Sequence, residues 1–163
     1  TGARIATCTA GTVLDVFQLQ TTKNELVEDT RLLGRLKDSI DSAVTGTLRP
    51  QAALRERWQS LPARVRRLPV PSRVILSNRI SSTHTVIEIN GRDFPGLLHR
   101  LTQTLADLGL QIQTATVSTY GERVVDVFYV KDLFGLQIHN QARLDTIRDR
   151  LLAVFDQLDE AAA

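Results

Sequence analysis

The residues best suited to chemistry lie in one short stretch, Asn90-Gly91-Arg92-Asp93-Phe94-Pro95-Gly96-Leu97-Leu98. Leucines recur after it at helical spacing, so we predict a loop leading into a helix, with Asp93 as cap and Pro95 in the first turn. Free amides and the positive end of a helix dipole suit a carboxylate. Asn90 and Asp93 offer acceptors for an ammonium group, and Gly96 lets a ligand approach the backbone. These groups fit the head of a free amino acid, but a capped helix start without a ligand has the same spacing.

Patterns typical of enzymes and metal sites are missing from the sequence. It has no Gly-x-Ser-x-Gly, P-loop or Gly-x-Gly-x-x-Gly motif, and no paired carboxylates in a shared loop. The single cysteine, Cys8, excludes an internal disulfide, and His84, His99 and His139 lack metal-ligand spacing. We therefore expect no catalytic residue and no metal ligand here, in a reduced cytoplasmic setting.

The composition indicates a folded chain with an uneven distribution of charge. Hydrophobic residues make up 42% and charged residues 23% of 163 residues, which is enough apolar material for a core. Eight arginines and one acid fall between positions 46 and 79, whereas the remainder is mildly acidic. Prolines recur in this basic segment, so residues 47–72 are predicted to be an Arg/Pro-rich linker. No apolar run is long enough to cross a membrane, so we expect no membrane partner.

The basic segment raises the question of a nucleic-acid partner, because arginines attract phosphates. Recognition of RNA by a sheet requires aromatic side chains that project from its central strands. The predicted strand at 85–90 has no aromatic residue. We therefore expect no nucleic-acid binding.

Hydrophobic periodicity predicts strands alternating with three helices. A capping-box spacing from Thr22 to Glu25 starts the first helix, and Gly46 and Gly109 end the first and second. The predicted strands cover about 2–7, 13–19, 74–76, 85–89, 110–119 and 123–130, and the predicted helices cover about 25–45, 96–108 and 141–158.

An internal repeat organises these elements, because residues 2–17 match residues 114–128 with one residue inserted at the first turn. Both copies place an aspartate, Asp15 or Asp126, within an apolar strand, and we predict that each faces an exposed or edge side of the sheet. The second copy has the order strand–helix–strand–strand–helix, a ferredoxin-like plait without its last strand. The first copy enters only at its second strand.

The predicted fold is therefore α+β, with two ferredoxin-like βαββαβ plaits of which neither is whole. Residues 1–46 form a partial first domain truncated at its N-terminus, with strands 2 and 3 and the second helix. Residues 73–163 form the second domain, lacking its last strand but preceded by an additional strand.

The letters of Thr85–Leu108, with the motif Asp-x-Pro-Gly-Leu-Leu, resemble the first strand, loop and helix of an ACT domain, an amino-acid-sensing plait. The resemblance implies a ligand loop and, as weaker candidates, two positions on a strand bordering an inter-domain interface. The matching positions are Asn90, Asp93, Pro95, Gly96, Leu97 and Leu98 in the loop, and Gln113 and Thr114 on the strand.

Nearly the whole chain, linker included, is similar to the C-terminal tandem ACT region of the bacterial bifunctional uridylyltransferase/uridylyl-removing enzymes. The segments that carry this similarity are Gly2-Ala3-Arg4-Ile5, Leu14-Asp15-Val16-Phe17, Leu48-Arg49-Pro50, Val70-Pro71-Ser72-Arg73-Val74, Tyr120-Gly121-Glu122-Arg123 and Asp126-Val127-Phe128.

This resemblance implies a regulatory role in nitrogen metabolism. In that family the ACT pair reads L-glutamine and sets the balance between uridylylation and deuridylylation of the PII signal protein. The catalytic domains, which would use Mg and UTP, lie upstream, so no cofactor is expected in these residues. ACT ligands usually lie between paired domains, so the expected partners include those upstream domains and a second copy in a homodimer. The alternative is a structural pairing module that joins exposed sheet edges without a ligand.

Overall fold

The computed structural model describes residues 2–7, 13–18, 29–48, 54 and 70–162. Its strands are β1 (Gly2–Thr7), β2 (Val13–Gln18), β3 (Arg73–Ser77), β4 (Thr85–Arg92), β5 (Gln111–Tyr120) and β6 (Arg123–Lys131). Its helices are α1 (Thr30–Val44), α3 (Leu97–Asp107) and α4 (Gln141–Ala162). Each predicted strand and helix therefore has a counterpart. Cys8, most of the predicted linker and the Thr22–Glu25 capping box lie outside the described residues.

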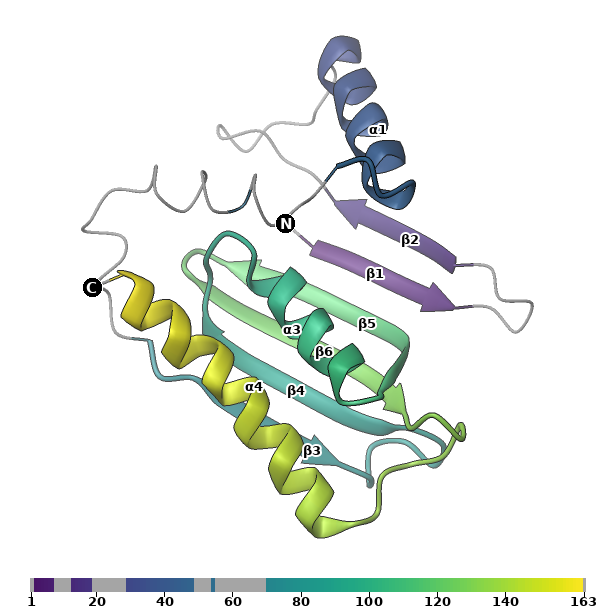
Figure 1. The fold of residues 1–163 in the computed structure, drawn as a ribbon, viewed down its shortest axis with the longest axis vertical. Helices are drawn as coiled ribbons and strands as arrows, with labels where there is room; N and C mark the ends of the chain where they lie inside the picture. Colours follow the sequence, from purple (N-terminus) through teal and green to yellow (C-terminus); the bar gives the residue numbers. More distant parts are fainter. Residues whose placement is uncertain (1, 8–12, 19–28, 49–53, 55–69, 163) are drawn as a thin grey trace.

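The strands form one antiparallel sheet in the order β2-β1-β5-β6-β4-β3 (Figure 1). Helices α3 and α4 lie side by side across one face of the part formed by β5, β6, β4 and β3 (Figure 1). We call the other side of the sheet the open face. β3, the additional strand predicted before the second copy, pairs with the outer edge of β4. The α+β class predicted from the sequence is confirmed.

The core lies between this sheet and the two helices. Alternate residues of β4 and β6 point into it, and α3 contributes the side of its leucine stripe that faces the sheet. Full burial of each large apolar side chain contributes about 1.5–3 kcal/mol of transfer free energy. The core residues with the least exposed surface are Ile87, Ile89, Leu101, Leu105, Ala115, Phe128, Val130, Ile147, Leu151 and Phe155.

Gly91 in β4 allows α4 to approach the sheet closely. A Cβ at this position would lie 2.3 Å from Cε1 of Phe155, so the phenyl ring occupies the space of the missing side chain. The same ring packs edge-on against Phe94, with 5.9 Å between the ring centroids. Any side chain at Gly91 would displace Phe155 from the core.

Two loops are tied together at the end of the sheet where β4 begins. The buried Thr85 hydroxyl donates to Asn78 Oδ1 at 2.8 Å and accepts from the Ile138 amide at 2.9 Å. Asn78 Nδ2 in turn donates to the Ile138 carbonyl at 2.8 Å. Next along the chain from β6, Asp132 Oδ1 accepts from the amides of Phe134 and Leu136, both at 2.9 Å. These bonds fix the position from which α4 starts.

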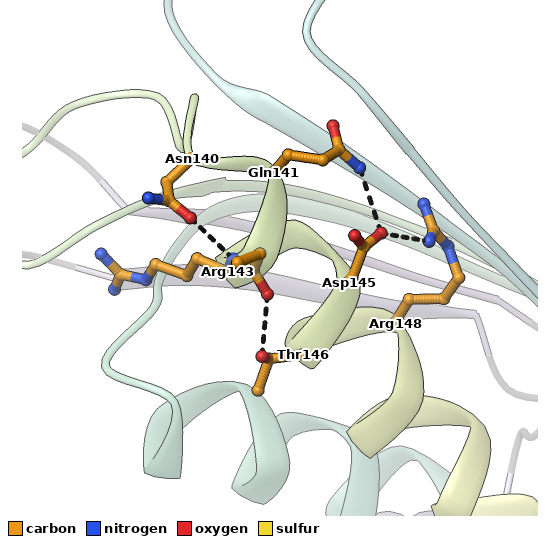
Figure 2. A network of polar contacts seen from close by, with 7 residues as sticks. Asn140, Gln141, Arg143, Asp145, Thr146 and Arg148 are labelled. Atoms are coloured by element: carbon orange, nitrogen blue, oxygen red, sulfur yellow. Dashed lines mark hydrogen bonds and ion pairs between the residues drawn. The ribbon is translucent and has the colours of Figure 1, made fainter.

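The start of α4 is held by its own polar side chains (Figure 2). Asn140 Oδ1 accepts from the Arg143 amide at 3.0 Å and caps the helix. One turn further on, Asp145 accepts from Arg148 at 2.6 Å, an ion pair three residues apart on the helix surface. The capping residue and the ion pair make Gln141–Ala162 a well-defined helix from its first turn.

The internal repeat predicted from the letters is confirmed by the strand register. In the first hairpin Ile5 lies opposite Asp15, and in the second hairpin Val117 lies opposite Asp126. The same correspondence holds at all six residue pairs that β1 forms with β2. The two hairpins are therefore structural copies of one another.

The two copies meet side by side, because β1 pairs with β5 in an antiparallel seam. Arg4 lies directly opposite Thr116, which is its equivalent in the repeat, so the seam has an approximate two-fold axis between these two residues. The two-fold axis relates the other pairs to one another. It maps the Gly2–Ser118 pair onto Ala6–Thr114, and the Ala3–Val117 pair onto Ile5–Ala115. The copies are joined by the strand that each contributes to the centre of the sheet.

The first copy is less covered than the second. Phe17 is 51% exposed, whereas its equivalent Phe128 is fully buried. Helix α1 begins at Thr30, later than the predicted start near 25, because Asp29 caps it by accepting from the Arg31 amide at 2.9 Å. None of its side chains is buried, so the apolar stripe Leu32, Leu33, Leu36, Ile40 and Val44 is open to solvent.

Candidate ligand-binding site

Helix α3 begins differently from the prediction. Its N-cap is Gly96, which adopts a left-handed backbone with φ of +88°, a conformation that favours glycine. Asp93 was expected to cap the helix, but the cap residue Gly96 makes no side-chain cap bond, and the Leu97 amide donates instead to the Phe94 carbonyl at 3.1 Å. Pro95 precedes the cap and does not occupy the first turn. The helix start is thus free of a side-chain acceptor, and a carboxylate could take that place.

Asp93 holds the loop against the neighbouring hairpin instead. Its backbone amide donates to the Glu122 carbonyl at 2.8 Å, which joins the end of β4 to the turn between β5 and β6. The side chain keeps contact with solvent, yet the protein around it removes enough water to raise its pKa. A hydrogen bond from the Phe94 amide partly offsets that rise.

Asp126 is the residue near this loop that the sequence prediction placed wrongly. Its side chain is only 1% exposed, because it shares the face of β6 that packs beneath the helices. Burial raises the pKa of its carboxyl to about 6, opposed by a hydrogen bond from the Ser118 amide and reinforced by the negative charge of Asp93. The equivalent Asp15 is exposed, as predicted, because neither α3 nor α4 covers its part of the sheet.

Asn90 lies away from this carboxylate pair. It belongs to β4 and not to a loop, because the pairing of β4 with β6 continues as far as Arg92 and Arg123. Its side chain is on the open face, where Nδ2 donates to Glu88 Oε1 at 2.8 Å. The structure therefore places Asn90 and the first turn of α3 on opposite faces of the sheet.

Gln113 and Thr114 lie where β5 changes register. The pairing of β5 with β6 shifts between Ile112 and Thr114, so Gln113 occupies a β-bulge. Thr114 lies opposite Ala6 in the seam. Thr114 thus lies on the strand that pairs with the first copy, level with Tyr129 and Val86 and away from the loop before α3.

The remaining loop positions are already packed. Leu97 is 2% exposed and belongs to the core, and Leu98 is partly buried against it. A Cβ on Gly96 would lie 3.2 Å from Cδ1 of Leu54, so Leu54 lies over the glycine that was expected to admit a ligand. In the first turn of the helix, Nε2 of His99 is buried without a hydrogen-bond partner among the described residues. No sequence pattern could have revealed the contact from Leu54 or the burial of the His99 nitrogen.

Comparison with known proteins identifies the fold built around this loop. Residues 80–156 match the family model described as the ACR family N-terminal ACT domain. The chain is an ACT-domain region. The match begins just before β4 and ends within α4, so it covers the copy that contains Asp93 and Asp126. No solved structure matches the chain.

The ACT-domain region has relatives among the bifunctional uridylyltransferase/uridylyl-removing enzymes. It is 48% identical over 155 residues to the enzyme of Rhodospirillum rubrum, an alignment covering 95% of this chain and 17% of that enzyme. The enzyme of Azospirillum brasilense is 47% identical, and that alignment covers 92% of this chain and 16% of the enzyme. The enzyme of Caulobacter vibrioides is 38% identical, and that alignment covers 99% of this chain and 17% of the enzyme. The region is homologous to the C-terminal part of such enzymes and spans 16–17% of their length.

Two other kinds of site are absent from the described residues. Among these residues no group of three or more histidine, cysteine, aspartate or glutamate side chains could hold a metal ion. No helix in the described part of the chain is long and apolar enough to cross a membrane.

Proposed function

We propose that this ACT-domain region is the glutamine-sensing part of a bifunctional uridylyltransferase/uridylyl-removing enzyme. The observation that carries the proposal is the 48% identity, over 95% of the chain, to an enzyme of that name. The role would be to set the balance between uridylylation and deuridylylation of the PII signal protein, as part of bacterial nitrogen regulation in the cytoplasm. Catalysis, with Mg and UTP, would belong to other domains of such an enzyme.

The proposed ligand site lies at the start of α3. The uncapped first turn suits the carboxylate of an amino acid, because its amides and the helix dipole both favour negative charge. Asp93 would accept the ammonium group, which would also relieve the repulsion between this carboxylate and Asp126. Gln113 and Thr114 are not part of this proposed site, because they lie beside Tyr129 and Val86, about six residues or roughly 20 Å along the strands from Arg92, and Thr114 is on the open face. Since Leu54 lies over Gly96, we expect the ligand to displace that leucine when it binds.

The proposed mechanism is a shift between two packings of the ACT pair. Glutamine can shift that equilibrium only by the difference in its affinity for the two packings, which is about 1–3 kcal/mol for most coupled sites. The exposed stripe of α1 and the unpaired edge of β2 support an interpretation of the first copy as the later half of a second plait.

The test is thermal unfolding of the 163-residue chain with millimolar glutamine, using glutamate and asparagine as controls. A ligand at 100 times its Kd stabilises by about 2.7 kcal/mol, which raises the Tm of a chain of this size by roughly 5–10 °C. Asp93→Ala should abolish this shift, whereas Asp149→Ala, on the exposed side of α4, should retain it. A folded Asp93→Ala variant that retains the full shift would remove Asp93 from the site.

A second candidate function is supported by the seam between β1 and β5. Edge strands pair readily with other strands, and no strand among the described residues covers the outer edge of β2 or of β3. A pure pairing module would show concentration-dependent association that no amino acid changes. Sedimentation at several concentrations, with and without glutamine, separates this function from ligand sensing.

A further inference from the structure

A hollow on the open face of the sheet lies across the seam between the two copies. Its volume is about 230 Å³, and its walls come from three adjacent strands. Val16 and Gln18 of β2 line one side, Thr116 and Ser118 of β5 line the other, and Arg4 of β1 lies between them. This surface is on the opposite side of the sheet from α3.

The hollow follows directly from the strand register. Gly2 lies opposite both Gln18 and Ser118, so the middle strand contributes no side chain in that row. In the next row on the same face Arg4 lies between Val16 and Thr116. Because Gly2 has no side chain, its row forms a recess in the surface. The guanidinium of Arg4, in the next row, lies at the border of this recess.

The described residues that line the recess include no carboxylate to balance its charge. Among the residues that the structure describes, no carboxylate forms an ion pair with Arg4. Asp15 is on the other side of the sheet, because it lies opposite Ile5 and not opposite Arg4. Glu88, on the open face, belongs to β4, three strands or roughly 14 Å from β1, and is bonded to Asn90.

We propose that this hollow binds a small oxyanion, the carboxylate or phosphate group of a metabolite. A guanidinium presents parallel donors that match the two oxygens of either group. The hydroxyl groups of Thr116 and Ser118 and the amide of Gln18 supply further donors around the same space. The site is separate from the amino-acid site at α3, because the sheet lies between them.

An anion in this hollow would contact both copies and so stabilise the seam between β1 and β5. Its contacts would come from β2 and β1 of the first copy and from β5 of the second, so binding would strengthen the seam. Ligands that bind only the paired arrangement stabilise it by mass action. The hollow therefore gives the ACT pair a second input, of different chemistry from an amino acid.

The experiment is an amide chemical-shift titration of the ¹⁵N-labelled 163-residue chain at neutral pH. The probes are sodium phosphate and sodium succinate, each added at constant ionic strength against sodium chloride. We expect saturable shifts at Arg4, Thr116 and Ser118 with at least one probe, and the tighter probe identifies the class of anion. Arg4→Gln should weaken that binding at least tenfold.

The matched control is Arg123→Gln, an exposed arginine on the open face of β6 outside the hollow. Binding that both variants weaken equally would mean general attraction to basic surface and would overturn the proposal. Shifts that chloride reproduces, or an absence of saturable shifts with both probes, would overturn it as well. Glutamine provides an independent arm, because its shifts should fall on residues 93–98 whether or not the hollow binds an anion.

Discussion

The buried carboxyl of Asp126 makes a quantitative prediction about stability and pH. Its pKa is about 6 in the folded protein, against an ordinary value of 3.8. The folded state therefore holds this proton more tightly than the unfolded state does. Between pH 4 and 6 the folded chain binds more protons, so the contribution of Asp126 to the free energy of unfolding falls as the pH rises.

The size of the effect follows from the shift of about 2 pKa units. Each unit corresponds to 1.36 kcal/mol, so ionised Asp126 costs the folded state roughly 3 kcal/mol above pH 7. Asp126→Asn keeps the shape of the side chain and an oxygen that can accept from the Ser118 amide. We expect this variant to be up to about 3 kcal/mol more stable at pH 7.5, with little difference at pH 4.

The assay is urea unfolding of both proteins at half-unit steps from pH 4 to 7.5, followed by circular dichroism. The difference between the two curves reports the Asp126 carboxyl together with its repulsion from Asp93, because groups that do not interact with Asp126 contribute equally to both. The control is Asp15→Asn, which changes the equivalent but exposed residue of the first copy and should leave the pH profile unchanged. Parallel pH profiles for the wild-type and Asp126→Asn chains would falsify the claim that this carboxyl is desolvated.

Three further substitutions test the packing of the second copy, each by the urea midpoint at constant m-value. Gly91→Ala should cost about 3 kcal/mol, because its Cβ overlaps the ring of Phe155; a loss below about 0.5 kcal/mol would show that the ring moves freely. Thr85→Val should cost about 1–3 kcal/mol, since it leaves the buried Ile138 amide without an acceptor, whereas Thr85→Ser should retain most of the stability. Asp132→Ala should cost about 2 kcal/mol by removing the acceptor of two loop amides, and Asp132→Asn should recover part of that loss.

The sequence predicted the elements of the fold better than the details of the site. Strong periodicity and glycine stops located both hairpins and the helices, and the repeat in the letters matched the hairpin register residue by residue. The burial of Asp126 could not be predicted, because β6 has apolar residues on both of its faces. Alternation therefore did not reveal which face the helices cover.

The loop before α3 was misread because two local signals were overridden by the structure around them. Asn90-Gly91 is typical of a turn, but pairing with the long strand β6 keeps both residues in β4. Asp93 is a favoured N-cap residue, yet the left-handed conformation of Gly96 starts the helix three residues later. The contact from Leu54 comes from a distant part of the chain and left no trace in the local sequence.

The two-fold seam also determines which strands can pair with one another. If β1 met a second β1 about the same axis, Arg4 would lie directly opposite another Arg4, and like charges in that position are destabilising. If β5 met a second β5, Thr116 would lie opposite Thr116, which is a favourable cross-strand pair. The mixed seam removes the first conflict by giving each arginine a threonine partner. Arg4 thus favours pairing of β1 with β5 over pairing of β1 with a second β1, whereas β5 can pair with either strand.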